Sequence, residues 1–196
     1  MHIQRLIILL SVLGLLVACG PYRFRSGQLL DPANPAPAIT LTDADGTPFQ
    51  LSDQHGALTL VFFGFTNCPD ICPTTLADLA AARKQLGADA EKVKVVLVTV
   101  DPERDTPDRL DRYVKAFDPS FIGLTGPRAD LEQIYQSYGV SVSKRELPNS
   151  ALGYTVDHGA SVYVIDQAGN WRALISNGST VADIVSDLRY LLRAGP

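Results

Sequence analysis

Apolar residues follow two alternating patterns along this chain. Residues 59–65 and 93–100 are continuous, β-branched-rich apolar runs, which are typical of strands buried on both faces of a sheet. Residues 73–86 and 106–117 instead carry apolar side chains at helical spacing, and Thr106 with Pro107 suits a helix start. Strands that alternate with helices favour a parallel-centred sheet covered by helices on both faces, so we predict an α/β fold.

Shorter segments complete this prediction. Two short strands around a Gly-containing turn, residues 39–41 and 48–51, predict an N-terminal β-hairpin. A second hairpin, residues 161–165 and 171–175, adds antiparallel strands and makes the central sheet mixed. Further helices are expected over residues 128–138 and 181–192.

The first nineteen residues form a separate unit. Arg5 precedes an apolar run from residue 6 to residue 18, shorter than the roughly 20 residues that span a bilayer, which is the pattern of an export signal. Residues 16–19, Leu-Val-Ala-Cys, resemble the lipobox of bacterial lipoproteins, where cleavage precedes a cysteine that receives a lipid. An uncleaved anchor, or an ordinary signal with an incidental Cys19, is the alternative interpretation.

The rest of the chain suits one domain. We predict a signal peptide over residues 1–18, a lipidated Cys19 with a flexible, Pro- and Gly-rich tether over residues 19–38, and a single domain over residues 39–196. The protein is then exported and lipid-anchored to a bacterial membrane, facing the periplasm. The net charge of −4 argues against nucleic-acid binding, and we expect a monomer.

Few side chains remain for soft-metal or redox chemistry. Met1 is the only methionine, and the signal would also remove His2. With Cys19 lipidated, the free thiols are Cys68 and Cys72, and the histidines are His55, in a turn, and His158. Outside the cytoplasm two nearby cysteines can oxidise, so a structural disulfide is one interpretation of the pair.

Cys68 and Cys72 lie between a buried strand and the start of a helix. Ligands gather at the carboxyl ends of such strands, and a helix N-terminus lowers the pKa of a thiol placed there. The i, i+4 spacing puts both sulfurs on one side of a helical turn, where they can bind a metal or form a disulfide. His158 is a possible third ligand, and Asp157 a possible fourth ligand or outer partner; from spacing alone, His158 could equally be a surface residue. Thiolate and imidazole ligands suit copper, and zinc nearly as well.

Four segments resemble the Sco/SenC family of copper-binding cytochrome c oxidase assembly proteins, in its bacterial lipoprotein form. They are FFGFTNCPDICPTTL (62–76), VTVDPERDTPDRL (98–110), LTG (124–126) and VDHGASVYVIDQAG (156–169). The resemblance implies a thioredoxin-like fold and copper, as Cu(I) or Cu(II), on Cys68, Cys72 and His158. It also implies a structural or partner-facing role for Asp101, Arg104 and Asp105.

The implied function is a metallochaperone that helps to build the CuA centre of cytochrome c oxidase, by copper transfer, by reduction of target cysteines, or both. The expected partner is the CuA-bearing subunit or another periplasmic copper protein. A thiol–disulfide oxidoreductase or peroxidase is the enzymatic alternative. Redox thioredoxins place a cis-proline opposite their cysteines, whereas here the corresponding segment contains His158 and no proline lies between Pro148 and Pro196. A copper or redox sensor is a third possibility.

Overall fold

The computed structural model describes residues 22–43 and 45–195, so the predicted signal peptide and Cys19 lie outside the described residues. A six-stranded mixed sheet, ordered β1-β10-β9-β4-β5-β6, forms its centre. The strands β4, β5 and β6 are parallel, and β9, β10 and β1 continue the sheet antiparallel to their neighbours. Their bounds are Gly27–Pro35 (β1), Leu58–Gly64 (β4), Val93–Thr99 (β5), Ile122–Leu124 (β6), Val162–Ile165 (β9) and Asn170–Ile175 (β10).

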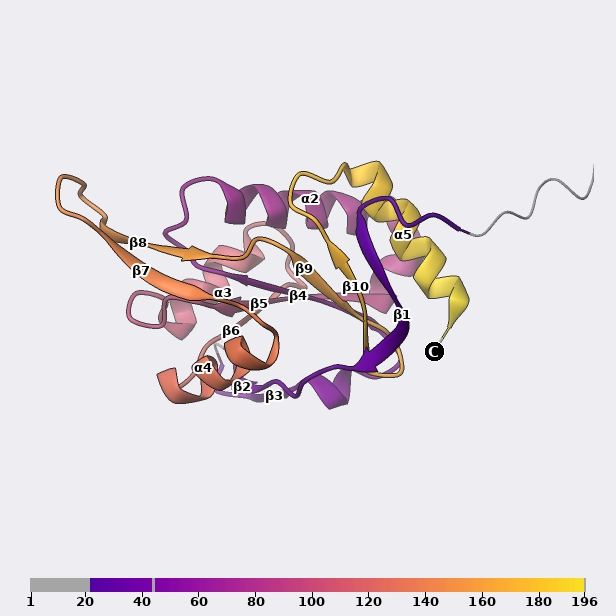
Figure 1. Ribbon diagram of the computed structural model, residues 1–196, viewed down its shortest axis with the longest axis horizontal. Helices are drawn as coiled ribbons and strands as arrows, with labels where there is room; N and C mark the ends of the chain where they lie inside the picture. Colours follow the sequence, from indigo (N-terminus) through magenta and orange to yellow (C-terminus); the bar gives the residue numbers. More distant parts are fainter. Residues whose placement is uncertain (1–21, 44, 196) are drawn as a thin grey trace, which may run out of the picture.

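Helices cover both faces of this sheet, as predicted (Figure 1). The helices α2 and α5 pack against each other on one face, while α4 lies on the opposite side with the small β2–β3 sheet (Figure 1). The helices, the short 3-10 helices η1 and η2 and the strands of the small sheet have these bounds: Thr40–Thr42 (β2), Pro48–Gln50 (β3), Leu51–Gln54 (η1), Ile71–Leu86 (α2), Gly87–Lys92 (η2), Pro107–Lys115 (α3), Arg128–Ser137 (α4) and Val181–Ala194 (α5).

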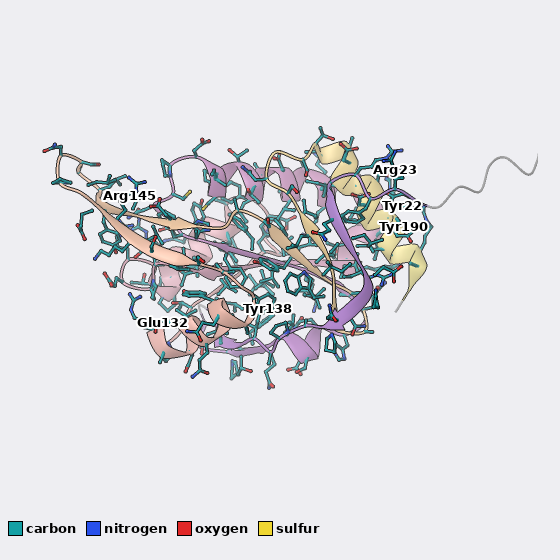
Figure 2. All side chains as sticks on the ribbon, in the orientation of Figure 1. Tyr22, Arg23, Glu132, Tyr138, Arg145 and Tyr190 are labelled. Atoms are coloured by element: carbon teal, nitrogen blue, oxygen red, sulfur yellow. The ribbon has the colours of Figure 1, made fainter. Side chains whose placement is uncertain are left out.

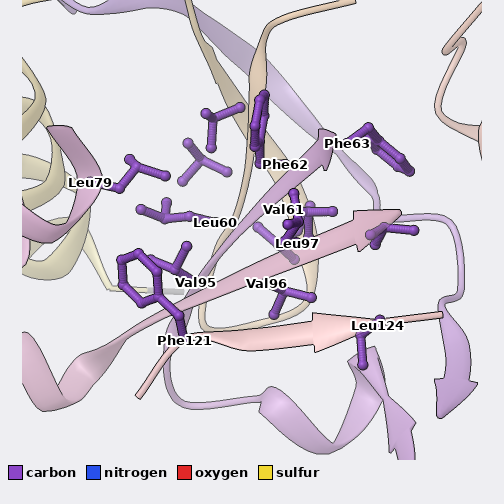
Figure 3. Packing of buried hydrophobic residues seen from close by; sticks show 14 of the residues in the cluster. Leu60, Val61, Phe62, Phe63, Leu79, Val95, Val96, Leu97, Phe121 and Leu124 are labelled. Carbon is purple, nitrogen blue, oxygen red and sulfur yellow. The ribbon is translucent and has the colours of Figure 1, made fainter. Parts of the chain in front are cut away.

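The two continuous apolar runs predicted from the sequence form β4 and β5 at the centre of the sheet. Every residue of β4 is buried, and its side chains alternate between the two faces. Figure 3 shows Leu60 and Phe62 on the side of Leu79 of α2, whereas Phe63 points the other way. The Phe63 ring meets the Tyr135 ring of α4 edge to face, with centroids 6.0 Å apart. Both faces of β4 are therefore filled by a core, which explains its lack of apolar–polar alternation.

The predicted tether is wrong over part of its length. Within residues 19–38, Gly27–Pro35 forms strand β1, which pairs with β10 at the edge of the sheet. The carboxylate of Asp187 on α5, fully buried, accepts hydrogen bonds from the Ser26 N–H at 2.6 Å and the Tyr22 hydroxyl at 2.5 Å. Because an edge strand is largely exposed and tolerates proline, β1 carries no apolar period that the sequence could reveal.

A hairpin formed by residues 142–158 was also absent from the prediction. The strands β7 (Val142–Leu147) and β8 (Gly153–His158) form a two-stranded antiparallel sheet that projects from one end of the molecule (Figure 1). The sequence predicts no strand just before residue 161, but β8 lies there and ends at His158. Most residues of this hairpin are exposed, so a hydrophobic pattern could not mark it.

Candidate metal centre

Cys68 and Cys72 lie where β4 gives way to α2. Cys68 is in residues 66–70, the cysteine loop, and Cys72 is the second residue of the helix. The backbone N–H of Cys72 donates a hydrogen bond to Sγ of Cys68 over 3.3 Å. The two sulfurs therefore share one side of the first helical turn, as the spacing predicted, and both cysteines are free thiols.

The site depends on a glycine at the end of β4. Cys72 is fully buried against this strand, and a Cβ atom added to Gly64 would stand only 3.2 Å from Sγ of Cys72. Any larger side chain at Gly64 would press on the sulfur. Gly64 therefore lets the helix bring Cys72 close to the sheet.

The two thiols differ strongly in acidity. A hydrogen bond from the Cys72 thiol, together with the backbone N–H groups of Cys72 and Asp70, lowers the pKa of Cys68 to about 5. The same hydrogen bond to Cys68, and burial, raise the pKa of the Cys72 thiol. At neutral pH, Cys68 is consequently a half-exposed thiolate beside a buried thiol that donates to it.

His158 completes the group from the end of β8. Its Nε2 lies 3.8 Å from Sγ of Cys72, and its Nδ1 is 2.7 Å from the carbonyl oxygen of Gly159. A carbonyl oxygen can only accept, so Nδ1 is the donor of this contact and Nε2 is the ring nitrogen that faces the cysteines. The rings of Phe62 and Phe65 pack edge-on against the imidazole, with centroids 6.3 and 5.8 Å away.

Cys68 and His158 line an open groove of about 250 Å³ between the cysteine loop and β8. Over residues 22–43 and 45–195, no three His, Cys, Asp or Glu side chains already stand at metal-binding distances from one another. Binding one shared ion therefore requires Cys68, Cys72 and His158 to move closer together. Two sulfurs and a neutral imidazole fit a soft or borderline metal.

Asp157 lines the same groove, but its carboxylate is already paired with an arginine. Its carboxylate accepts two hydrogen bonds from Arg145 on β7, at 2.8 and 3.0 Å, and this guanidinium lowers the pKa of Asp157. Figure 2 shows Arg145 on the projecting hairpin. Neighbouring residues of a strand project to opposite faces, so Asp157 and His158 diverge. The role of Asp157 as a fourth ligand stays a prediction. To bind a metal, Asp157 would first have to break its ion pair with Arg145.

Asp105 holds the cysteine loop. This carboxylate, buried in the loop between β5 and α3, accepts hydrogen bonds from the Thr66 N–H at 3.1 Å and the Thr66 hydroxyl at 2.6 Å. The Thr99 hydroxyl donates to it at 2.7 Å. Burial raises the pKa of Asp105 and these hydrogen bonds oppose the rise. Asp105 therefore has the structural role that its motif implied.

Asp101 and Arg104 contact the other half of the site. The buried Asp101 carboxylate accepts from Arg104 Nε at 2.5 Å and from the Tyr154 hydroxyl at 2.7 Å. Arg104 Nη1 also donates to the carbonyl oxygens of Leu152 and Tyr154, each at 3.1 Å. One loop, residues 100–106, thus contacts both the cysteine loop and the hairpin that carries His158.

Sequence reasoning missed Gly64, Thr66 and Tyr154. Tyr154 precedes His158 by four residues, so in a strand both side chains project to one face. That signal was available only if residues 153–158 had been predicted as a strand.

Proteins from several bacteria are similar to this chain in sequence and in fold. An SCO2-like protein of Rickettsia prowazekii is 37% identical over 136 residues, a match that spans 64% of this chain and 66% of that relative. The solution structure of apo Sco1 from Thermus thermophilus is 38% identical and superposes with a TM-score of 0.78, covering 88% of this chain and all of that one. The copper-bound structure of ScoI from Bradyrhizobium japonicum is 36% identical with a TM-score of 0.72, covering 80% and 99% of the two chains.

The fold is shared more widely. A thiol:disulfide interchange protein of the thioredoxin family from Chlorobium tepidum superposes with a TM-score of 0.56 at 19% identity, covering 82% of this chain and 97% of that one. This structural similarity confirms the thioredoxin-like fold, and it concerns the fold alone. The SCO1/SenC family profile matches residues 29–193, which include most of β1, both cysteines and His158. The chain therefore belongs to the SCO1/SenC family.

Proposed function

We propose that this protein binds copper as cargo through Cys68, Cys72 and His158 and delivers it during assembly of the CuA centre of cytochrome c oxidase. The convergence of one thiolate, a second sulfur and an imidazole Nε2 at one edge of the sheet carries this proposal. Membership in a family of cytochrome c oxidase assembly proteins supports it. So does the copper-bound structure of the Bradyrhizobium relative.

The shape of the site suits delivery rather than storage. Cys68 is half-exposed and faces the groove, whereas Cys72 is buried. A partner's thiolate can therefore approach a bound ion from the groove side and replace the ligands one at a time. A CuA-bearing subunit or another periplasmic copper protein is the proposed recipient.

Copper titration of the reduced protein tests the ligand set. The His158→Ala variant should bind copper at least about 10-fold more weakly than the wild type and should have a changed Cu(II) charge-transfer spectrum. His55→Ala is the matched control, because His55 is exposed in a turn away from the cysteines. Equal affinities and spectra for His158→Ala and the wild type would remove His158 from the site.

Thiol–disulfide exchange is a second candidate, favoured by the low pKa of Cys68. A thiolate at this position can attack a disulfide of a target protein, and Cys72, four residues away, can resolve the mixed disulfide. Reduction of target cysteines before copper transfer would use the same pair. The His158→Ala variant separates the two functions, since it should keep thiol exchange while losing copper affinity.

We also propose a lipid anchor at Cys19 in a bacterial membrane, with the domain in the periplasm. Over the part of the chain that the structure describes, no helix has the length and apolarity needed to cross a membrane. Tyr22 stacks on Tyr190 of α5 at the end of the molecule opposite to the β7–β8 hairpin, so an anchor just before Tyr22 would turn the metal site away from the membrane (Figure 2). Mass spectrometry of the mature N-terminus tests this, and an unmodified Cys19 would refute it.

A further inference from the structure

The hairpin that carries His158 has little support of its own. It forms a two-stranded sheet separate from the central one, and isolated two-stranded hairpins are only marginally stable in water. Among the residues of β7 and β8, all of which the structure describes, Val156 alone is buried. The position of His158 must therefore be determined by contacts between the hairpin and the body of the protein.

The strongest of these contacts involve Tyr154. Its hydroxyl donates a 2.7 Å hydrogen bond to the carboxylate of Asp101, which is only 3% exposed. The guanidinium of Arg104 lies over the Tyr154 ring, 3.6 Å from its centroid, while it also binds the backbone carbonyl oxygen of Tyr154 at 3.1 Å. One residue of β8 is thus held through its ring, its hydroxyl and its backbone.

The contacts of Asp101 are costly to break, because its buried carboxylate is charged. A buried carboxylate requires hydrogen-bond donors, and Asp101 receives them from Arg104 at 2.5 Å and from Tyr154. Arg104 satisfies Asp101 and the hairpin carbonyls with the same planar group. The body side of the contact is itself anchored, because Asp101 lies two residues after the end of β5 and its N–H donates to the hydroxyl of Thr99, the last residue of β5, at 2.9 Å.

The geometry of a strand transmits this restraint to the metal site. Tyr154, Val156 and His158 alternate with their neighbours and project to the face that meets the body. Tyr154 and His158 are four positions apart, about 13 Å along the strand. With Val156 buried between them, a fixed Tyr154 limits how far His158 can swing from Cys72.

We propose that Asp101, Arg104 and Tyr154 form a clamp that positions His158 over the cysteine pair. The clamp residues are positioning residues, because they act through the hairpin and not on the metal. This inference rests on the proposed function, since it assumes that His158 binds copper together with Cys68 and Cys72. Through Asp105 and Thr66, the same loop also holds the cysteine side of the site.

The Tyr154→Phe variant tests the clamp, because it removes the hydroxyl and keeps the ring beneath Arg104. We expect copper to bind about 10-fold more weakly, the typical cost of one hydrogen bond to a charged group. Tyr163→Phe is the matched control, since it removes a hydroxyl that donates to the Tyr138 carbonyl at 3.1 Å, away from the hairpin. Equal affinities for the two variants would overturn the proposal.

A double-mutant cycle shows whether the clamp acts through His158. In the His158→Ala background, Tyr154→Phe should leave copper affinity unchanged, because the residue being positioned is absent. An equal loss in both backgrounds would mean that Tyr154 acts in some other way and would refute the clamp. If the wild type bound no copper, or if His158→Ala bound as tightly as the wild type, the proposed function would fail instead.

Hydrogen exchange provides a readout without copper. In the metal-free protein, amides of β7 and β8 should exchange about 10-fold faster in Tyr154→Phe than in the wild type, while amides of β4 and β5 should not change. Unchanged exchange in the hairpin would refute the clamp whatever the result with copper.

Discussion

The acidity of Cys68 leads to a quantitative prediction. Its pKa is lowered from 9.0 to about 5, chiefly by the hydrogen bond from Cys72. At pH 6 about nine in ten Cys68 side chains are then thiolates, against about one in a thousand for a thiol with a pKa of 9.0. The reactive fraction is therefore roughly 900-fold larger in the folded protein.

Lower basicity offsets part of this gain. Thiolate nucleophilicity falls with pKa with a Brønsted coefficient of about 0.4–0.5, so a fall of about four pKa units costs roughly 60-fold in intrinsic rate. The folded protein should thus react about 15-fold faster than an unfolded thiol at pH 6. At pH 9, where the unfolded thiol is also largely ionised, the order reverses and the folded protein should react roughly 30-fold more slowly.

The assay is stopped-flow reaction of the reduced, metal-free protein with a dithiodipyridine between pH 4 and pH 9, with urea-unfolded protein as reference. Partial burial of Cys68 lowers all the folded rates together, so the midpoint of the pH profile is the diagnostic quantity. We expect a midpoint near pH 5, because the rate falls as Cys68 becomes protonated. In Cys72→Ala the midpoint should rise, since the main stabilising donor is lost. A wild-type midpoint above pH 7, or no change in Cys72→Ala, would refute this reasoning.

Three further substitutions test how the structure supports the site. Gly64→Ala should weaken copper binding in titrations, because the new methyl group would stand 3.0 Å from the side chains of Phe62 and Leu97 and 3.2 Å from Sγ of Cys72, so the packing around the sulfur would have to shift. Asp105→Ala should lower the free energy of unfolding in urea by about 2–3 kcal/mol, since it leaves the Thr66 N–H and buried hydroxyls without their acceptor. Asp187→Ala should cost a similar amount, about 2–3 kcal/mol, and should release the segment before β1 to limited proteolysis.

Asp111→Ala is the control for both carboxylate variants. Its ion pair with the exposed Lys115, at 2.7 Å, is screened by solvent and should contribute little to the free energy of unfolding. Equal midpoints for Asp111→Ala and either buried variant would contradict the hydrogen-bond argument. For Gly64→Ala, wild-type copper affinity would show that the sulfur can move aside freely.

The sequence by itself determined the central fold and the cysteine half of the site. The strands β4 and β5 are buried on both faces, so their apolar runs are unmistakable, and the helices that follow them have clear periods. A cysteine pair between a buried strand and a helix start depends on local chain geometry, which is why its position could be predicted. The predicted lowering of the thiol pKa holds for Cys68 but is wrong for Cys72, whose pKa is raised by the hydrogen bond to Cys68 and by burial. His158 was identified only with the help of the family resemblance.

Only the tertiary structure decided the parts that lie at the edges. The strand β1 and the β7–β8 hairpin are largely exposed, so they carry no hydrophobic pattern. A tether was predicted in place of β1, and no strand was predicted in place of β7 and β8. The contact of Tyr154 with Asp101 joins residues that are 53 positions apart, and that of Tyr22 with Asp187 joins residues 165 positions apart. Polar contacts of this kind leave no local period, because their partners meet only after the chain has folded.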